Sequence, residues 1–453
     1  MHETIQEASL SSREPTGKKW QIAWVHNGDV GGAKRFTFEM VARLSARGHV
    51  IDEYIVSGPV RNGEYLSLKP FVRTSSELIV RHPDLSWLRP HLLSTCVQLG
   101  ATLWTMHKIK QTFHALAGVI NTARYDFVHM DQYTFCRAIG VLPHLRRPTV
   151  VYIHEASAMR YQQPSCNTGI GQKSAFRSWY ASLCELAGNL NTNALNKRDL
   201  FETRFAQAVL TNSYYSKEIF FQRYGRHSRV CYLGVDSEVF RPASVPVEPM
   251  LLCAGRIVRA KQYHLVIEAV GMIERSLRPH VVFATPECID RLAQPSYAEE
   301  LSRLAKDKEV DLTVKYRPSQ QELVSLYNQA LALVFIPLME PFGLVALEAM
   351  ACGTPVIGVR EAGIRESVID GVTGILVDRE PIQIAAAITR LQQQETRTQM
   401  SRRGVEEVHA RWSWEHTVDR YEEEVQKLLY SREHAAQGTL NSGVLPNNLR
   451  TNN

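Results

Sequence analysis

The sequence lacks several features that mark secreted, membrane-spanning or metal-binding proteins. Its eight cysteines form no C-x-x-C pair and no spacing typical of metal ligands, so we expect buried free thiols in a reducing compartment. Residues 1–19 are polar and hold no apolar signal-peptide segment. The longest uncharged run, residues 90–107, contains a proline and several polar residues, which disfavours a spanning helix. These absences together predict a cytoplasmic protein.

The excess of positive charge is mild for a chain of this length. Lys plus Arg numbers 52 and Asp plus Glu 46, which gives a formal charge of +6 over 453 residues. Nucleic-acid binding usually appears as a concentrated basic stripe, so we expect no nucleic-acid partner. The charge is compatible with an anionic small molecule or an anionic membrane surface. The chain has no Asp-x-Asp pair, and we expect neither a metal ion nor another cofactor.

Short apolar runs alternate with amphipathic stretches in two successive parts of the chain. In the first part, residues 21–27 predict a buried strand and residues 33–48 a helix. The apolar residues of this helix fall on one face, namely Phe36, Met40, Val41 and Leu44. A proline-rich stretch, residues 240–249, interrupts this pattern, which then begins again. In the second part, Ser319 to Glu322 ("SQQE") fits a capping box at a helix start. Such alternation is typical of parallel α/β sheets, whose ligands bind beyond the carboxyl ends of the strands. We therefore predict an α/β protein with two Rossmann-like parallel-sheet domains facing a central cleft.

The chain length itself suggests two or three domains at roughly 150 residues each. We expect a disordered lead (1–19), a first domain (20–240), a linker (241–249), a second domain (250–410), a C-terminal helix crossing back to the first domain (411–432) and a disordered tail (433–453).

The segment 92–109 leaves two interpretations open. Its apolar residues recur at helical spacing, and basic residues flank it on both sides. A helix packed on the sheet explains the spacing. An interfacial patch for an anionic membrane or a lipid acceptor also explains the flanking charge. Peripheral contact with the cytoplasmic membrane face is therefore kept as an alternative.

Two glycine-rich or basic turns follow predicted strands. In "GDVGGAKR", Gly31 and Gly32 would allow close approach of a ligand to the backbone, and the helix that follows supplies free N–H groups for an anion. The full G-x-G-x-x-G fingerprint is missing, which disfavours a nicotinamide oxidoreductase. In "CAGRIVRAKQ", Arg256 follows a strand and Lys261 stands at a helix start, where two cations suit a diphosphate. A plain tight turn and a solvated basic turn are the alternatives.

The stretch "EPFGLVALEAM" carries a carboxylate at each end of an apolar segment. Glu340 lies in the loop after a buried strand, and Glu348 lies in the helix that begins near Gly343. Buried carboxylates need hydrogen-bond donors, which sugar hydroxyls provide, although a structural salt bridge for each glutamate is the alternative. In "VYIHEA", His154 ends a strand at the carboxyl edge, so a ligand contact competes with a structural role.

Together these segments resemble the family-4 retaining glycosyltransferases, whose GT-B fold has two facing Rossmann-like domains. The resemblance covers residues 20–430, and it is specific because six segments stand in the family's order. The segments are "GDVGGAKRFTFEMVARLSARGHV", "VYIHEA", "AVLTNSYYSKEI", "YLGVDSEVFRP", "CAGRIVRAKQYHLVIEA" and "EPFGLVALEAMACGTPVIGVREAGIRESVIDGVTGILV".

The resemblance implies a nucleotide-sugar donor that is bound mainly by the second domain. Arg256 and Lys261 match the diphosphate-binding pair of the family. Glu348 matches the glutamate that holds the ribose, and Glu340 matches the glutamate at the donor sugar. In the family, backbone amides lie beside the glutamate at the donor sugar. They correspond to the amides of Phe342, Gly343 and Leu344 in this chain.

In the first domain, Gly31 and Gly32 match the loop that closes over the donor phosphates. His154 matches a histidine that contacts the transferred sugar, so Glu340, His154, Arg256 and Lys261 form the expected catalytic set. The implied acceptor is a glycan, a glycolipid or a lipid-linked sugar bound by the first domain, and family frequency favours a UDP- or GDP-linked hexose.

One loop departs from the family pattern. Where the family often has Gly-Gly-x-Pro-Glu, this chain has Ala362-Gly363-Ile364-Arg365-Glu366, so the first glycine and the proline are missing. We assign Glu366 a structural role. Two other functions stay open, namely a nucleotide-sugar epimerase on the same fold and a non-catalytic relative that binds nucleotide sugars.

The interfacial interpretation of residues 92–109 predicts that the protein co-sediments with anionic vesicles and not with neutral ones. Basic side chains near a surface are attracted to anionic headgroups, and salt weakens that attraction. The measurement compares the wild-type chain with a Lys108→Glu, Lys110→Glu variant at two salt concentrations. If the wild-type chain stays in the supernatant with anionic vesicles, the packed-helix interpretation is correct.

Overall fold

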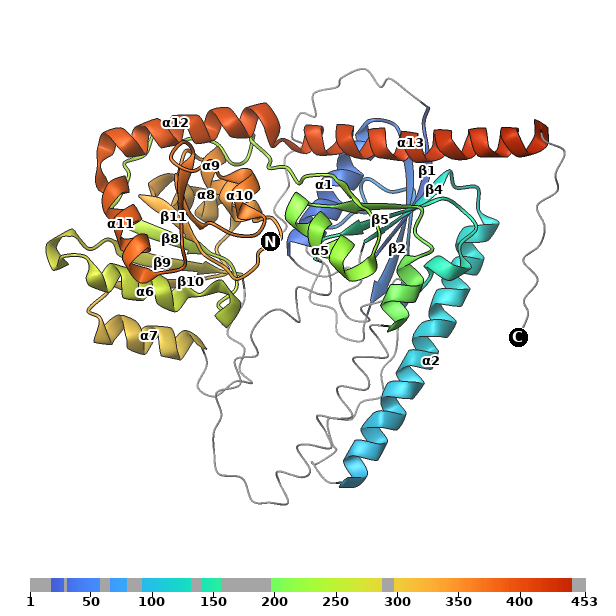
Figure 1. The fold of residues 1–453 in the computed structure, drawn as a ribbon, viewed down its shortest axis with the longest axis horizontal. Coiled ribbons are helices and arrows are strands. Elements are labelled where there is room, and N and C mark those ends of the chain that lie inside the picture. Colours follow the sequence, from blue (N-terminus) through green and yellow to red (C-terminus); the bar gives the residue numbers. More distant parts are fainter. Residues whose placement is uncertain are drawn as a thin grey trace. The chain divides into compact units, whose positions relative to one another are not determined.

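The structure is a computed structural model that describes residues 18–27, 31–57, 66–79, 92–131, 140–155, 197–286 and 297–441. The chain divides into two compact units, each built on a parallel sheet with helices packed against it (Figure 1). Residues 211–417 belong to one unit, and residues 18–152, 197–210 and 418–441 belong to the other. This architecture confirms the predicted α/β class with two parallel sheets.

The seven-stranded sheet has the order β3-β2-β1-β4-β5-β6-β7. Strand β1 pairs in parallel with β2 and with β4, and β2–β3 and β4–β5 are parallel as well. Its strands are β1 (Gln21–His26), β2 (Val50–Ser57), β3 (Thr74–Ile79), β4 (Phe127–Asp131), β5 (Thr149–Ile153), β6 (Ala208–Thr211) and β7 (Arg229–Val230). The helices in this part of the chain are α1 (Gly32–Ala46), α2 (Leu92–Thr122), η1 (Leu142–His144) and α5 (Tyr214–Tyr224).

The six-stranded sheet has the order β10-β9-β8-β11-β12-β13, and all five of its pairs are parallel. The order reverses between β8 and β11, as it does in doubly wound nucleotide-binding folds. Its strands are β8 (Met250–Ala254), β9 (His280–Thr285), β10 (Leu312–Tyr316), β11 (Ala332–Phe335), β12 (Val356–Val359) and β13 (Gly374–Val377). The helices are η2 (Arg259–Lys261), α6 (Tyr263–Met272), η3 (Arg275–Leu277), α7 (Tyr297–Asp307), α8 (Gln320–Gln329), α9 (Leu344–Ala351), α10 (Ile364–Ser367), α11 (Pro381–Gln392) and α12 (Gln394–Arg411).

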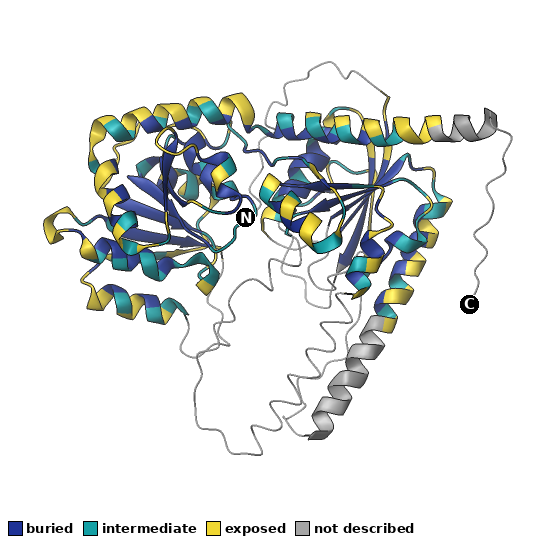
Figure 2. Cartoon of the chain, viewed as in Figure 1, coloured by how far each residue is buried: buried dark blue, intermediate teal, exposed yellow. Residues whose placement is uncertain are grey.

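Continuous apolar runs explain why most strands of the two sheets are buried. The inner strands β4, β8, β11 and β12 and the edge strand β13 are buried along their whole length, as expected where helices cover both faces of a parallel sheet (Figure 2). The edge strands β3 and β10 are mostly exposed or half-buried. The apolar face predicted for α1 is confirmed, because Phe36, Met40, Val41 and Leu44 are all buried.

In the part of the chain that forms the six-stranded sheet, the predicted capping box is confirmed, whereas helices α10 and α12 were missed. The Ser319 hydroxyl accepts from the Glu322 amide while the Glu322 carboxylate accepts from the Ser319 amide, which is the predicted capping box. Helix α12 was not predicted, because it is mostly polar and buries few side chains. Helix α13 (Trp414–Asn441) continues past residue 433, where the sequence predicts a disordered tail to begin. The proposed domain limits stay predictions.

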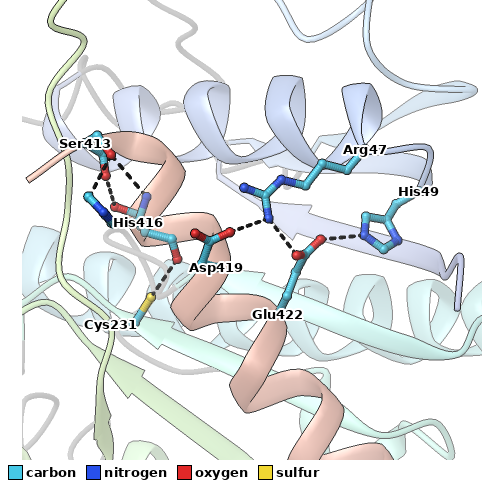
Figure 3. A network of polar contacts seen from close by, with 8 residues as sticks. Arg47, His49, Cys231, Ser413, His416, Asp419 and Glu422 are labelled. Carbon is cyan, nitrogen blue, oxygen red and sulfur yellow. Dashed lines mark hydrogen bonds and ion pairs between the residues drawn. The ribbon is translucent and has the colours of Figure 1, made fainter. Parts of the chain in front are cut away.

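From residue 418 onward, helix α13 packs on the unit that contains β1 and β4 (Figure 3). The His49 ring accepts a hydrogen bond at Nδ1 from the Trp20 amide at 3.1 Å, so its proton is on Nε2. That Nε2–H donates to Glu422 at 2.8 Å, and Arg47 donates to the same carboxylate at 2.7 Å and to Asp419 at 2.8 Å. Burial raises the pKa of Glu422, but the hydrogen bond from His49 and the nearby Arg47 outweigh it and hold the pKa below its usual value.

We predict that Glu422→Gln destabilises the protein by about 1–2 kcal/mol at neutral pH, because the variant loses two charge-assisted hydrogen bonds. A carboxylate with a lowered pKa in the folded state stabilises above its unfolded pKa, and this stabilisation is lost as the pH falls through the folded pKa. The difference from wild type should therefore shrink below about pH 4.5. The free energy of unfolding is measured by urea titration across this range.

Glu423→Gln is the matched control, because Glu423 lies on the same helix and pairs with Lys427 at an exposed position. We expect this change to leave the free energy of unfolding the same as that of the wild type at any pH, because exposed ion pairs contribute little. A Glu422 effect equal to that of the control, or one that does not change with pH, would contradict the prediction.

Candidate functional site

The candidate site lies at the carboxyl ends of β8 and β11, the two neighbouring strands between which the order of the six-stranded sheet reverses. Crevices at such a reversal are where doubly wound sheets bind their ligands. Arg256 stands two residues beyond β8 with an exposed side chain, and Glu340 lies in the loop after β11. Pairing of β8 with β11 thus brings together residues that are far apart in the sequence.

Lys261 and Glu340 form an ion pair at the carboxyl ends of these two strands. The Lys261 Nζ donates to Glu340 Oε2 at 2.8 Å, and both side chains are about four-fifths buried, with exposed fractions of 21% and 23%. Nζ also lies 5.1 Å from the centre of the Phe335 ring. The amide of Leu338 donates to the Ala260 carbonyl at 2.8 Å, which joins the loop after β11 to η2. Two residues that the resemblance assigns to different parts of the donor are therefore direct neighbours.

Helix α9 begins at the site, and its N-cap is a glycine that no other residue could replace without strain. Gly343 is the N-cap with a φ of 92°, and a Cβ there would lie 2.6 Å from the Phe335 ring. Gly343 caps α9 without a side-chain hydrogen bond, so the first amides of the helix, from Leu344, have no side-chain cap at this end. The Phe342 side chain is buried against Tyr232 and Trp412, so only the backbone at Phe342 is available for a ligand.

Glu348 lies on α9 beside a tyrosine that sequence reasoning missed. The Tyr327 hydroxyl donates to Glu348 Oε2 at 2.9 Å, and the Tyr327 side chain is fully buried. Burial raises the pKa of Tyr327 well above its usual value, and the charge of Glu348 raises it further, so the hydroxyl stays a hydrogen-bond donor. The sequence signals Tyr327 only as one apolar position of α8, because its contact depends on how α8 and α9 pack.

Three of the predicted site residues, His154, Gly31 and Gly32, lie in the first part of the chain. His154 follows β5 and is half-buried, and its backbone carbonyl accepts from the Asn212 side chain at 2.9 Å. Gly31 is the N-cap of α1 with a φ of 116°, and Gly32 is the first residue of that helix. Residues 28–30 of the same turn lie outside the described residues. The roles of His154, Gly31 and Gly32 in donor binding stay predictions.

The loop that departs from the family pattern lies directly against the site. Ala362 has a φ of 52°, so it adopts the left-handed conformation that the family's glycine would take without strain. Gly363 donates its amide to the Glu340 carbonyl at 3.0 Å, and a Cβ on Gly363 would lie 1.9 Å from the Pro341 carbonyl oxygen. The missing first glycine therefore leaves the backbone path intact, while the second glycine is required by close contact.

Glu366, in the same loop, has contacts that agree with the structural role assigned to it. Its carboxylate accepts hydrogen bonds from the amides of Tyr214 and Tyr215 at 2.8 and 2.9 Å, at the start of α5. The Tyr232 hydroxyl donates to it at 2.9 Å. A carboxylate at a helix N-terminus satisfies amides that the helix itself leaves unpaired.

Comparison with known proteins agrees with this geometry. Residues 30–239 match the model of Glycosyltransferase Family 4, and residues 236–407 match that of Glycosyl transferases group 1. A relative from Catenulispora acidiphila, named D-inositol 3-phosphate glycosyltransferase 1, is 32% identical over 88% of this chain and 91% of its own length. The chain belongs to the family-4 glycosyltransferases.

Other relatives of this glycosyltransferase match it over different shares of their length. A D-inositol 3-phosphate glycosyltransferase from Geodermatophilus obscurus is 26% identical over 91% of this chain and 89% of the relative. One from Frankia alni is 36% identical, over 36% of this chain and 43% of the relative. The matches to the Geodermatophilus and Catenulispora proteins thus include both units of the chain.

Solved structures show the same GT-B fold. Sucrose-phosphate synthase from Thermosynechococcus elongatus superimposes with a TM-score of 0.67 at 20% identity, over 92% of this chain and all of that one. The Anabaena protein HepE in complex with UDP and glucose gives 0.63 at 17% identity, over 90% of this chain and all of that one. Among the described residues of this glycosyltransferase, no helix combines the length and the apolar character needed to cross a membrane.

We predict that Gly363→Ala destabilises the enzyme by about 3 kcal/mol, because the added Cβ overlaps the Pro341 carbonyl. Gly118→Ala is the matched control, since Gly118 lies inside α2 and a Cβ there meets nothing within 4 Å. The same change should stabilise the enzyme by up to about 1 kcal/mol at that position. Both unfolding free energies are measured by urea titration, and a Gly363 variant as stable as wild type would contradict the close approach.

Proposed function

We propose that this enzyme transfers a hexose-type sugar from a UDP- or GDP-linked donor, with retention of anomeric configuration, to a hydroxyl of a glycan, glycolipid or lipid-linked acceptor. The observation that carries the proposal is the Lys261–Glu340 pair at the reversal point of the six-stranded sheet, where Arg256 follows the end of β8. This arrangement combines cations for a diphosphate with a carboxylate that can accept hydrogen bonds from sugar hydroxyls.

Charge development in the reaction gives each group a role. Cleavage of the bond between the sugar and the diphosphate builds negative charge on the leaving phosphate. Arg256, Lys261 and the amides at the start of α9 supply positive charge and N–H dipoles to stabilise that charge. On a front-face route the leaving phosphate accepts the acceptor's proton, so no protein nucleophile is assigned and no metal is required.

We assign Glu348 to the opposite end of the donor, where it binds the ribose of the nucleotide. Its Oε2 accepts from the Tyr327 hydroxyl at 2.9 Å, and a carboxylate has further acceptor positions for ribose hydroxyls. Glu340 is assigned to the sugar, with His154 as a second contact to the transferred sugar. Gly31 and Gly32 are assigned to the donor phosphates, as the family resemblance implies.

The named relatives suggest where to look for the acceptor. The relatives from Catenulispora, Geodermatophilus and Frankia are named for D-inositol 3-phosphate, a phosphorylated polyol. These relatives are 26–36% identical to this chain, so we include D-inositol 3-phosphate in the acceptor screen beside glycans and lipid-linked sugars. The HepE structure with UDP and glucose favours UDP-glucose as the first donor to test. Peripheral contact with an anionic membrane stays part of the proposal for the lipid-linked acceptors.

We predict that Lys261→Ala and Arg256→Ala each lower sugar transfer at least about a hundredfold without unfolding the protein, because the leaving phosphate loses a stabilising cation. The thermal unfolding midpoint is first measured with UDP-glucose, UDP-N-acetylglucosamine and GDP-mannose, since a bound donor raises it. The nucleotide sugar with the largest shift is then used for transfer assays against the acceptor panel.

Lys306→Ala is the control, because Lys306 is exposed on α7, away from the strand ends that form the site. It should bind donor and transfer sugar as the wild type does. Wild-type transfer by both site variants would overturn the diphosphate assignment. Turnover of the nucleotide sugar into an epimer without any acceptor would favour the epimerase instead.

A further inference from the structure

A second ion pair lies, like the site, beyond the carboxyl ends of the strands. It contacts the loop that carries Glu340. Arg379 follows β13, and Glu361 follows β12. Arg379 Nη1 donates to Glu361 Oε2 at 3.1 Å, and Nη2 makes a second, shorter contact with Glu361 Oε1. This is the two-point geometry by which an arginine grips a carboxylate most strongly. The resemblance to the family assigns a function to neither residue.

Both partners also bond to the backbone of the loop after β11. Arg379 Nη2 donates to the Pro337 carbonyl at 2.8 Å, and its Nε donates to the Ile336 carbonyl at 3.4 Å. Glu361 Oε1 accepts from the Met339 amide at 3.3 Å. The pair therefore satisfies a donor and two acceptors of a segment that leaves the sheet and has no ladder partners of its own. The carboxyl ends of β11, β12 and β13 are tied together by these two side chains.

The backbone at this point needs such support. Met339 has a φ of 49°, in the left-handed region that non-glycine residues rarely adopt. Strained residues of this kind persist only where surrounding contacts hold them. Glu361 provides one such contact at Met339 itself, and the next residue along the chain is Glu340. A shift at Met339 would therefore move Glu340 and the start of α9 directly.

The charge state of the pair suits this task. The Arg379 side chain has an exposed fraction of 18%, so its charge is only partly screened by water. Burial raises the pKa of Glu361, but the hydrogen bond from Arg379 and that from the Met339 amide outweigh burial and hold the pKa below its usual value. Glu361 is thus ionised at neutral pH.

We propose that Glu361 and Arg379 are positioning residues for sugar transfer, which hold the Pro337–Met339 backbone so that Glu340 and the amides at the start of α9 meet the sugar end of the donor. The inference rests on the proposed function of Glu340. Glu361 directly precedes the loop Ala362–Glu366, which departs from the family pattern.

A neighbouring arginine makes the same kind of contacts without touching the site loop. Arg360 Nη1 donates to Asp370 at 2.9 Å, and its Nη2 donates to the Leu376 carbonyl at 2.6 Å. These contacts hold the turn between α10 and β13. Arg360→Gln therefore removes an ion pair and a bond to a carbonyl from the same sheet edge, and it serves as the matched control for Arg379→Gln.

The experiment measures dissociation constants by isothermal titration calorimetry for two probes. One is whichever of UDP-glucose, UDP-N-acetylglucosamine and GDP-mannose stabilises the wild-type enzyme most, and the other is its nucleoside diphosphate alone. In Arg379→Gln the loop at the sugar end is held less firmly. The dissociation constant of the nucleotide sugar should therefore rise about tenfold, and that of the nucleoside diphosphate less than about threefold. Arg360→Gln should leave both dissociation constants within about twofold of wild type.

Three further variants separate a positioning role from an effect on folding. Arg379→Lys keeps the charge and one donor, so it should recover part of the lost affinity for the nucleotide sugar. Glu361→Gln keeps an oxygen for the Met339 amide, whereas Glu361→Ala removes it, so only Glu361→Ala should match Arg379→Gln. If Arg379→Gln does not fold, Glu361→Ala and Arg379→Lys carry the test with the same criterion.

The outcomes distinguish this inference from the proposed function. If Lys261→Ala and Glu340→Gln lose donor binding while Arg379→Gln and Glu361→Ala keep the wild-type ratio between the two probes, the positioning role is wrong and the donor site stands. Equal weakening of both probes by Arg379→Gln would also overturn the positioning role. If Lys261→Ala and Glu340→Gln bind the nucleotide sugar as the wild type does, the proposed function fails and this inference fails with it.

Discussion

The turn between β11 and α9 is the constraint on which the candidate site depends. The chain leaves strand β11 at Phe335 and begins helix α9 at Leu344. The residues in between form the turn at the carboxyl end of β11. Met339 and Gly343 of this turn lie in the left-handed region, and Gly363 packs directly against Pro341. The Phe335 ring at Gly343 and the Pro341 carbonyl at Gly363 leave no room for a Cβ. The position of Glu340 thus follows from the path of the backbone before any ligand is considered.

The acidic groups at this edge differ in the kind of partner they have, and this difference suits a donor with chemically different ends. Glu340 and Glu361 each face a cation, Lys261 and Arg379 respectively, as expected for partly buried carboxylates. Glu348 accepts a hydrogen bond from the Tyr327 hydroxyl. A diphosphate adds negative charge where cations already lie, whereas ribose hydroxyls add donors to a carboxylate that already accepts from a hydroxyl.

Much of the fold followed from local patterns. Continuous apolar runs predicted the buried strands, the spacing of Phe36, Met40 and Leu44 predicted the inner face of α1, and Ser319 with Glu322 predicted a capping box. Helix α12 escaped prediction because its buried residues are few, so the polar sequence gave little periodic signal. Strong periodicity and cap chemistry are local properties, and they survive folding unchanged.

The sequence by itself determined the class of fold, the strand ends at which Arg256 and Glu340 lie, and the glycine at the start of α9. Only the tertiary structure decided which side chains meet. Lys261 with Glu340, Tyr327 with Glu348 and Arg379 with Glu361 are pairs separated by 79, 21 and 18 residues along the chain. The physical reason is that hydrogen bonds and ion pairs depend on distances of a few ångströms in space, which the order of parallel strands sets and which no spacing along the chain encodes.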